Sequence, residues 1–123
     1  MDARTEPFQL EKNGTRVFIN VPDKKEVRIA DVVKRTTLAR WPTKAATTCA
    51  RMALDEAHQR LFIGCRMPAR LLVFDITNGK IVASPEIGAD ADGLFYDAAR
   101  SRVYVIGGQG VHRYLAATGF RSL

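Results

Sequence analysis

Apolar and polar positions alternate along this chain in short runs separated by polar turns. The runs are rich in Val, Ile, Phe and Tyr, as in Arg60–Gly64 and Leu71–Asp75, which favours pleated, half-buried strands. Dipeptides such as Asn13-Gly14 and Asn78-Gly79 provide the backbone freedom that tight hairpins need. No window shows a sustained helical stripe. The pattern predicts an all-β chain of short antiparallel strands.

An internal repeat organises these strands. Arg16–Asn20, Arg60–Gly64 and Arg102–Ile106 align at spacings of 44 and 42 residues, and Val27–Asp31 matches Leu71–Asp75 at 44. Each repeat accommodates four strands, which in the second repeat are expected at about 51–54, 60–64, 71–75 and 81–84. Four strands in 40-odd residues is typical of a β-propeller blade. The sequence therefore predicts about three blades of four antiparallel strands.

The motifs Arg-Leu-Phe-Ile-Gly at 60–64 and Leu-Val-Phe-Asp at 72–75, completed by Thr-Asn-Gly-Lys-Ile-Val-Ala at 77–83, resemble the YVTN-type repeat, a relative of WD40-like blades. The resemblance spans about 8–120. It implies a β-propeller fold and is nearly silent about function. Relatives of this type are often periplasmic or exported, and their complete propellers have more than three blades.

The whole chain, 1–123, is expected to form one propeller-type domain. Blade 1 is expected at about 8–44, blade 2 at about 50–87 and an incomplete blade 3 at about 93–123. In the third repeat Leu115 stands where the others have Asp31 and Asp75, and the sequence reaches Leu123 before a full fourth strand. Blade stacking is expected to bury six side chains: Phe18, Phe62, Val73, Phe74, Ile81 and Tyr104.

Three blades do not close a ring, so both ends of the array expose apolar blade surface. We expect the chain to form a homo-oligomer, most simply a dimer with about six blades. Two alternatives are a piece of a longer propeller and a degenerate one.

Functional residues are expected on the rim formed by the loops that lead into the first strands and by those that join the second and third strands. Arg66, Asp90, Asp92 and His112 lie there and are candidate binding residues for an unknown protein or small-molecule ligand. The favoured function is a non-enzymatic binding or scaffolding module, with no catalytic residue, metal or cofactor assigned. The alternative is a lactonase-like or hydrolase-like enzyme in which Asp90, Asp92 and His112 from several chains meet at a channel. The pair Asp90 and Asp92 alone is a weak metal signal.

Cys49 and Cys65 are the two cysteines. The expected hairpin puts Met52 near Ile63 and, further along the ladder, Ala50 opposite Cys65. This register brings Cys49 within reach for a disulfide in an oxidising compartment. Two buried free thiols are the favoured interpretation. Trp41 is expected to pack between blades or chains.

Charge and composition also bear on whether the chain binds nucleic acid or a membrane. The net charge is +6, with 13 Arg and 6 Lys scattered along 123 residues, so nucleic-acid binding is not favoured. No apolar run approaches the roughly 20 residues of a membrane span. The polar start, 1–7, shows no signal peptide, which leaves the compartment unassigned.

Overall fold

The structure is a computed structural model that describes residues 8–43, 47–67, 69–87, 91–107, 110–115 and 121–122, with backbone alone at 47–48, 91–92, 111–115 and 121–122. Its strands group into three sheets. Sheet 1 holds β1 (Phe8–Leu10), β2 (Arg16–Val21), β3 (Glu26–Asp31) and β4 (Thr36–Pro42). Sheet 2 holds β5 (Thr47–Asp55), β6 (Arg60–Met67), β7 (Ala69–Asp75) and β8 (Lys80–Ala83). Sheet 3 holds β9 (Ala91–Asp97), β10 (Arg102–Gly107), β11 (Gly110–Leu115) and β12 (Arg121–Ser122).

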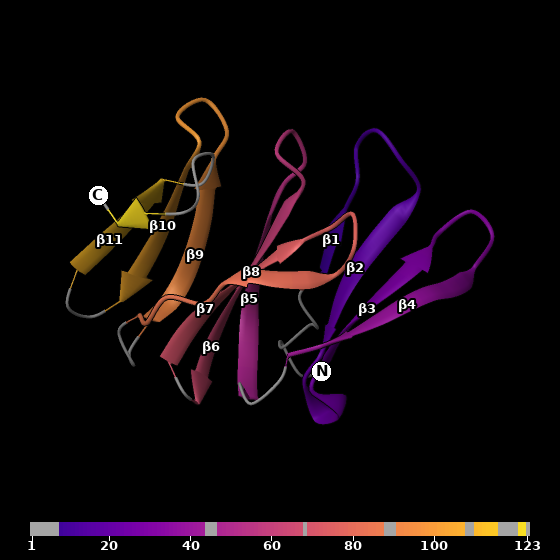
Figure 1. Ribbon diagram of the computed structural model, residues 1–123, viewed down its shortest axis with the longest axis horizontal. Helices are drawn as coiled ribbons and strands as arrows, with labels where there is room; N and C mark the ends of the chain where they lie inside the picture. The colour runs from indigo at the N-terminus through magenta and orange to yellow at the C-terminus, as the bar shows by residue number, and fades with distance from the viewer. Residues whose placement is uncertain are drawn as a thin grey trace, which may run out of the picture.

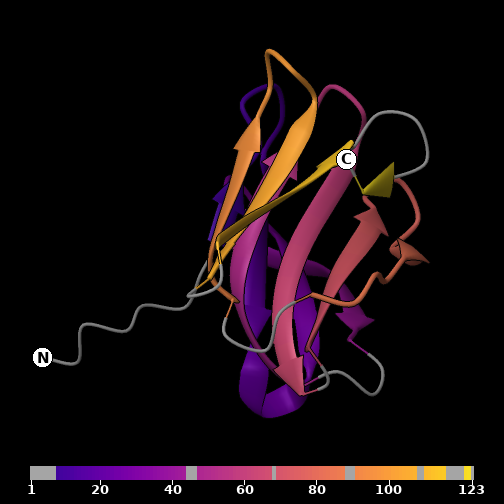
Figure 2. The same cartoon turned by 90° about the vertical axis from the view of Figure 1, so that its left-hand side faces the viewer.

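Each sheet is a four-stranded antiparallel meander in chain order, as the repeat predicts. The three sheets lie side by side, face to face, with sheet 2 in the middle (Figure 1). A view turned by 90° shows the strands of neighbouring sheets running roughly along one another (Figure 2). The first strand of sheet 2, β5, contacts both β1 and β9, so the first strands lie innermost. Within the described part of the chain, no helix is long and apolar enough to cross a membrane.

Sheet 2 supplies side chains to two separate cores because consecutive residues of a strand point to opposite faces. Leu61 and Ile63 of β6 belong to a core shared with sheet 1, whereas Phe62 between them belongs to a core shared with sheet 3. The same division holds in β7, where Phe74 faces sheet 1 and Val73 faces sheet 3. Both faces of sheet 2 therefore carry buried side chains, and its two middle strands, β6 and β7, contain nearly continuous apolar runs.

Aromatic rings join sheets 1 and 2. Trp41 of β4 lies between Phe18 and Phe74, with ring centroids 5.9 Å and 5.8 Å away, so the expectation that Trp41 packs between blades is confirmed. Its indole also covers the β7–β8 turn, where Gly79 has φ +77°. A Cβ atom at Gly79 would overlap the indole, and the left-handed conformation disfavours any other residue there.

Two of the side chains that were expected to be buried are less enclosed in the structure than predicted. Tyr104 is half-buried and lies on the face of sheet 3 that points away from sheet 2, where no further sheet of the described residues covers it. Ile81 is only partly buried. In the third repeat the described fourth strand is short, with Arg121 and Ser122 pairing with β11.

Candidate functional site

The rim expected to carry function lies at the lower end of the sheets in Figure 1, on the same side as the short 3₁₀ helix η1 (Pro22–Lys24) between β2 and β3. Arg66 lies there, exposed, near the end of β6. Asp90 is outside the described residues, and Asp92 and His112 are described as backbone of β9 and β11 only. The structure therefore places Arg66 on this rim, and a site shared with the other three side chains stays a prediction.

A pocket of about 230 Å³ opens between sheets 2 and 3 near this rim. Its walls are largely apolar, and two arginines, Arg51 and Arg66, line it. The other lining residues come from β5, β6 and β7, from the segment after β8, and from β9 and β10: Ala50, Gly64, Cys65, Leu71, Ile87, Gly93, Leu94 and Val105.

Gly64 accounts for the hollow. Arg51, Gly64 and Leu71 are register partners across β5, β6 and β7, so they form one row on the face of sheet 2 that points to sheet 3. In the next row along that face, Ala53, Phe62 and Val73, the phenyl ring of Phe62 fills the space. The row of Gly64 has no side chain at its centre, and the space stays open.

Arg51 was not among the residues expected to be functional. It lies on β5 directly opposite Gly64, and it is exposed. The repeat did contain the signal, because pairing Met52 with Ile63 also places Arg51 opposite Gly64. A glycine facing an arginine in an otherwise apolar sheet marks a gap beside a cation.

A disulfide joins Cys49 and Cys65 at one edge of the pocket, so the free thiols favoured on sequence are not what the structure contains. The register of β5 against β6 shifts between Cys49 and Arg51, which leaves Ala50 as the extra residue and pairs the two cysteines directly. The side-chain amide of Asn20 in sheet 1 donates a hydrogen bond to the carbonyl oxygen of Cys49. Sheet 1, the disulfide and the pocket wall are therefore in contact.

The opposite rim carries a polar network that links sheets 2 and 3. The buried carboxylate of Asp55 accepts from the amide nitrogen of His58, lies 2.8 Å from His58 Nδ1 and accepts from the Tyr96 hydroxyl. Burial, together with this hydrogen bond to Asp55, raises the pKa of Tyr96 to about 12. Ser101 also hydrogen-bonds the phenol. The network fixes one sheet against the next, which is a structural role.

Carboxylates also close the turns of this rim. The Asp75 carboxylate accepts from the hydroxyl and the amide of Thr77, and these bonds lower the pKa of Asp75. Asp31 accepts from the amides of Val33 and Lys34, the latter bond being the main reason that its pKa is lowered. Among the side chains that the structure describes, no group of three His, Cys, Asp or Glu residues could hold a metal ion.

Comparison with known proteins identifies the fold. No protein-family model matches the chain, and no curated protein matches it. Among solved structures, hydrazine synthase of Kuenenia stuttgartiensis matches at a TM-score of 0.75 with 15% identity, over 97% of this chain and 35% of that one. The β-propeller domain of Cps50 (Swd1) of Myceliophteria thermophila matches at 0.75 with 9% identity, over 98% and 39%. Hsv2 of Kluyveromyces lactis matches at 0.66 with 11% identity, over 97% and 36%.

These similarities, together with the three four-stranded antiparallel sheets, show that the chain has the β-propeller fold. The sheets are its blades. The chain spans little more than a third of the length of the structures described above. At such low identity the similarity shows the fold alone.

Proposed function

We propose that this protein is a non-enzymatic β-propeller module for binding or scaffolding that completes its ring by self-association, with two copies giving about six blades. The observation that carries the proposal is that both end sheets present blade-packing surfaces on which no other sheet of the described residues packs. We further propose that the repeat is of the YVTN type, on the motifs at 60–64 and 72–75.

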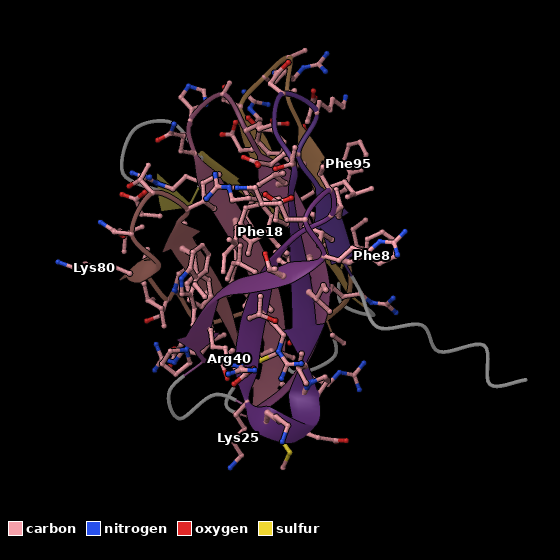
Figure 3. The ribbon with its side chains drawn as sticks, turned by 90° about the vertical axis from the view of Figure 1, so that its right-hand side faces the viewer. Phe8, Phe18, Lys25, Arg40, Lys80 and Phe95 are labelled. Atoms are coloured by element: carbon pink, nitrogen blue, oxygen red, sulfur yellow. A yellow bond between two sulfur atoms is a disulfide. The ribbon has the colours of Figure 1, made fainter. Side chains whose placement is uncertain are left out.

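The first of these surfaces, the sheet 1 open face, comprises Phe8, Leu10, Val17 and Ile19, of which Val17 is buried and Ile19 is half-buried. Phe8 and Leu10 are 55% and 52% exposed. Register pairs Phe8 with Ile19 and Leu10 with Val17, so the four side chains share one side of the sheet. Figure 3 looks toward sheet 1 and shows Phe8 at the edge of the fold, whereas Phe18 lies inside it.

The second surface, the sheet 3 open face, comprises Phe95, Tyr104 and Ile106. Phe95 and Ile106 are 59% and 41% exposed, and the Phe95 and Tyr104 rings lie 6.3 Å apart. Clusters of exposed apolar side chains on a sheet face favour contact with another protein surface.

The repeat indicates which surface each open face fits. Shifted by 44 residues, the sheet 1 open face corresponds to Met52, Leu54, Leu61 and Ile63, which sheet 2 packs against sheet 1. Shifted back by 42 residues, Phe95 and Tyr104 correspond to Ala53 and Phe62, which sheet 2 packs against sheet 3. Each open face thus has the residues of one half of a blade interface, and the two halves differ. The sheet 1 face of one copy is expected to meet the sheet 3 face of the other.

A two-fold axis along the central channel of the ring closes this arrangement. Each of the two interfaces of the dimer then joins one sheet 1 open face to one sheet 3 open face. The fit is not wholly apolar. Arg28 stands where sheet 2 has the buried Leu72, and its guanidinium lies 3.0 Å from the Glu26 carboxylate. A mixed interface of this kind is typical of partners that also exist apart.

Light scattering coupled to gel filtration tests the proposal by mass. The wild type is expected to elute as a two-chain particle, and a monomer at every concentration would refute self-association. Phe8→Asp and Phe95→Asp are each expected to yield monomers, because a charge would be buried in either interface. Val33→Asp is the matched control, since Val33 is exposed in a turn outside both open faces.

The two interface variants also test the direction of association. A dimer built from two sheet 1 faces would be lost in Phe8→Asp and kept in Phe95→Asp, which would contradict the head-to-tail arrangement. In an equimolar mixture, each variant retains the face that the other lacks. The mixture is therefore expected to recover pairs through one intact interface.

A further inference from the structure

We propose that the pocket between sheets 2 and 3 binds a small organic carboxylate with an apolar body, whose charge is held by Arg51 and Arg66. The inference deepens the proposed binding role by naming its ligand class. It does not depend on self-association, because every residue that lines the pocket belongs to one chain.

The repeat shows that the cavity is particular to this blade interface. Gly64 corresponds to Asn20 in the first repeat and to Ile106 in the third. Asn20 is buried between sheets 1 and 2, where its side chain fills the equivalent position and hydrogen-bonds Cys49. Only the second repeat lacks a side chain there, so the opening is a local feature of the interface between sheets 2 and 3.

The backbone does not require this glycine. Gly64 is not among the glycines with positive φ, and a Cβ atom built on it would meet only the Arg51 Cβ, at 3.8 Å. A side chain could therefore be present without strain or overlap at its Cβ. A ligand that occupies this space would explain why the chain has glycine at position 64.

The walls define the body of the ligand. Leu71 on one side and Leu94 and Val105 on the other are apolar, and Phe62 in the neighbouring row shows that a six-membered ring fits between the sheets. A volume of about 230 Å³ is below the roughly 300–1,000 Å³ of pockets for drug-sized ligands. The ligand is thus a small molecule, of the size of one ring or a short alkyl chain.

The two arginines define its charge. Arg51 lies opposite Gly64 across the ladder, and Arg66 lies two residues further along β6, so both are on the face that points to sheet 3. Among the described residues, neither guanidinium takes part in a hydrogen bond or ion pair, whereas Arg16, Arg28 and Arg100 all do. Guanidinium groups bind carboxylates through paired hydrogen bonds. Apolar walls favour a singly charged carboxylate over the more strongly hydrated phosphate dianion.

Titration of the isotopically labelled chain by NMR tests the proposal with three probes. Benzoate has both ring and charge, benzamide has the ring alone, and acetate has the charge alone. Benzoate is expected to shift the amide signals of Gly64, Leu71 and Leu94 with a dissociation constant between about millimolar and micromolar, the range for so few atoms. Benzamide and acetate are expected to bind at least about tenfold more weakly, the effect of one lost charge-assisted contact or of the lost ring burial.

Three variants locate the site. Gly64→Leu fills the hollow and is expected to abolish benzoate binding while the chain remains folded. Arg51→Gln and Arg66→Gln are each expected to weaken benzoate binding by about tenfold. Lys80→Gln removes the same charge on the opposite rim, away from the pocket lining, and is expected to bind like wild type.

Several outcomes would overturn the proposal: no benzoate shifts at millimolar concentration, equal affinity for benzamide, or unchanged binding in the three pocket variants. The same experiments distinguish failure of the proposed self-association from failure of the pocket proposal. A monomer that binds benzoate refutes self-association and leaves the pocket standing, whereas a dimer that does not bind refutes the pocket alone.

Discussion

At the scale of residues, the side chains of sheet 2 differ in how completely they are enclosed, and this decides what a substitution costs. Phe62 has no exposed surface and packs 5.8 Å from the ring of Tyr96 in sheet 3. Gly64, two residues along the same strand, faces an open space instead. Positions two residues apart on one strand therefore differ in surroundings, since one is packed against sheet 3 and the other borders the pocket.

Phe62→Ala is expected to lower the free energy of unfolding by about 3–5 kcal/mol, since a large buried ring leaves a cavity between two sheets. Urea denaturation followed by circular dichroism measures the change. Val82→Ala, at an exposed position of β8, is the control and is expected to stay within about 0.5 kcal/mol of wild type. A small effect at Phe62 would mean that sheets 2 and 3 are not packed as described.

Because the pKa of Tyr96 is raised in the folded state, we expect the protein to lose stability at alkaline pH. Its pKa is raised to about 12 by burial and by the hydrogen bond to Asp55, above the value of about 10 for an unfolded chain. The unfolded state therefore releases this proton first, so the stabilisation is complete below about pH 10 and is lost as the pH rises toward 12. Urea titrations across this range should show a smaller alkaline loss in Tyr96→Phe. An identical loss in the variant would argue against the network.

At the scale of elements, turns and cross-strand links hold each sheet together. The acids that close the β3–β4 and β7–β8 turns are repeat equivalents, Asp31 and Asp75, and they accept backbone hydrogen bonds in the same way. Their lowered pKa values mean that the ionised form stabilises the fold. This contribution is present above about pH 4 and is lost as the pH falls through the folded-state values.

The β7–β8 turn allows a test of the backbone conformation at Gly79 and of the packing of Trp41 on it. Gly79→Ala is expected to lower the free energy of unfolding by at least about 1–2 kcal/mol, the cost of a left-handed conformation, and to displace Trp41 in addition. Tryptophan fluorescence reports the displacement, because Trp41 is the single tryptophan. Gly64→Ala is the matched control, since its Cβ atom has room. Equal behaviour of the two variants would contradict the packing of Trp41 on this turn.

The disulfide provides a second prediction for sheet 2. Cys49 and Cys65 are 16 residues apart, and closing a loop of about 15 residues is worth about 3 kcal/mol in the chain-entropy estimate. The double variant Cys49→Ala, Cys65→Ala is expected to lose about that much stability in urea. Thiol titration of the unfolded wild type under air is expected to find no free thiol. Two reactive thiols there would restore the interpretation favoured by sequence.

At the scale of the whole molecule, the three sheets bury the faces that they turn toward one another, and no other sheet of the described residues covers the two outer faces. An array of repeats ordinarily ends in a polar surface, whereas Phe8 and Phe95 are apolar and exposed at opposite ends. The proposed ring pairs these ends. Its prediction is the two-chain mass described above, together with its loss in Phe8→Asp and Phe95→Asp.

The sequence predicted more of the fold than of the site. The repeat located the strand cores of sheet 2 and the pairing of Met52 with Ile63. It missed the β-bulge at Ala50. A bulge adds one unpaired residue without requiring a particular residue type, so the pattern of apolar and polar positions does not reveal it. The repeat therefore placed Cys65 opposite Ala50 rather than Cys49. It selected Arg66 as a rim residue and overlooked Arg51, whose relation to Gly64 becomes plain only when β5 and β6 are laid side by side.

The amino-acid order by itself determined the strands, their turns and their fourfold grouping, because alternation and turn residues act over a few neighbouring positions. Tertiary structure alone decided which faces meet. Phe62 and Tyr104 occupy equivalent places in the repeat, yet one is enclosed and the other is half exposed, since burial depends on whether another sheet lies beside it. The pocket has the same origin: Gly64 is a gap only because sheet 3 stands opposite it.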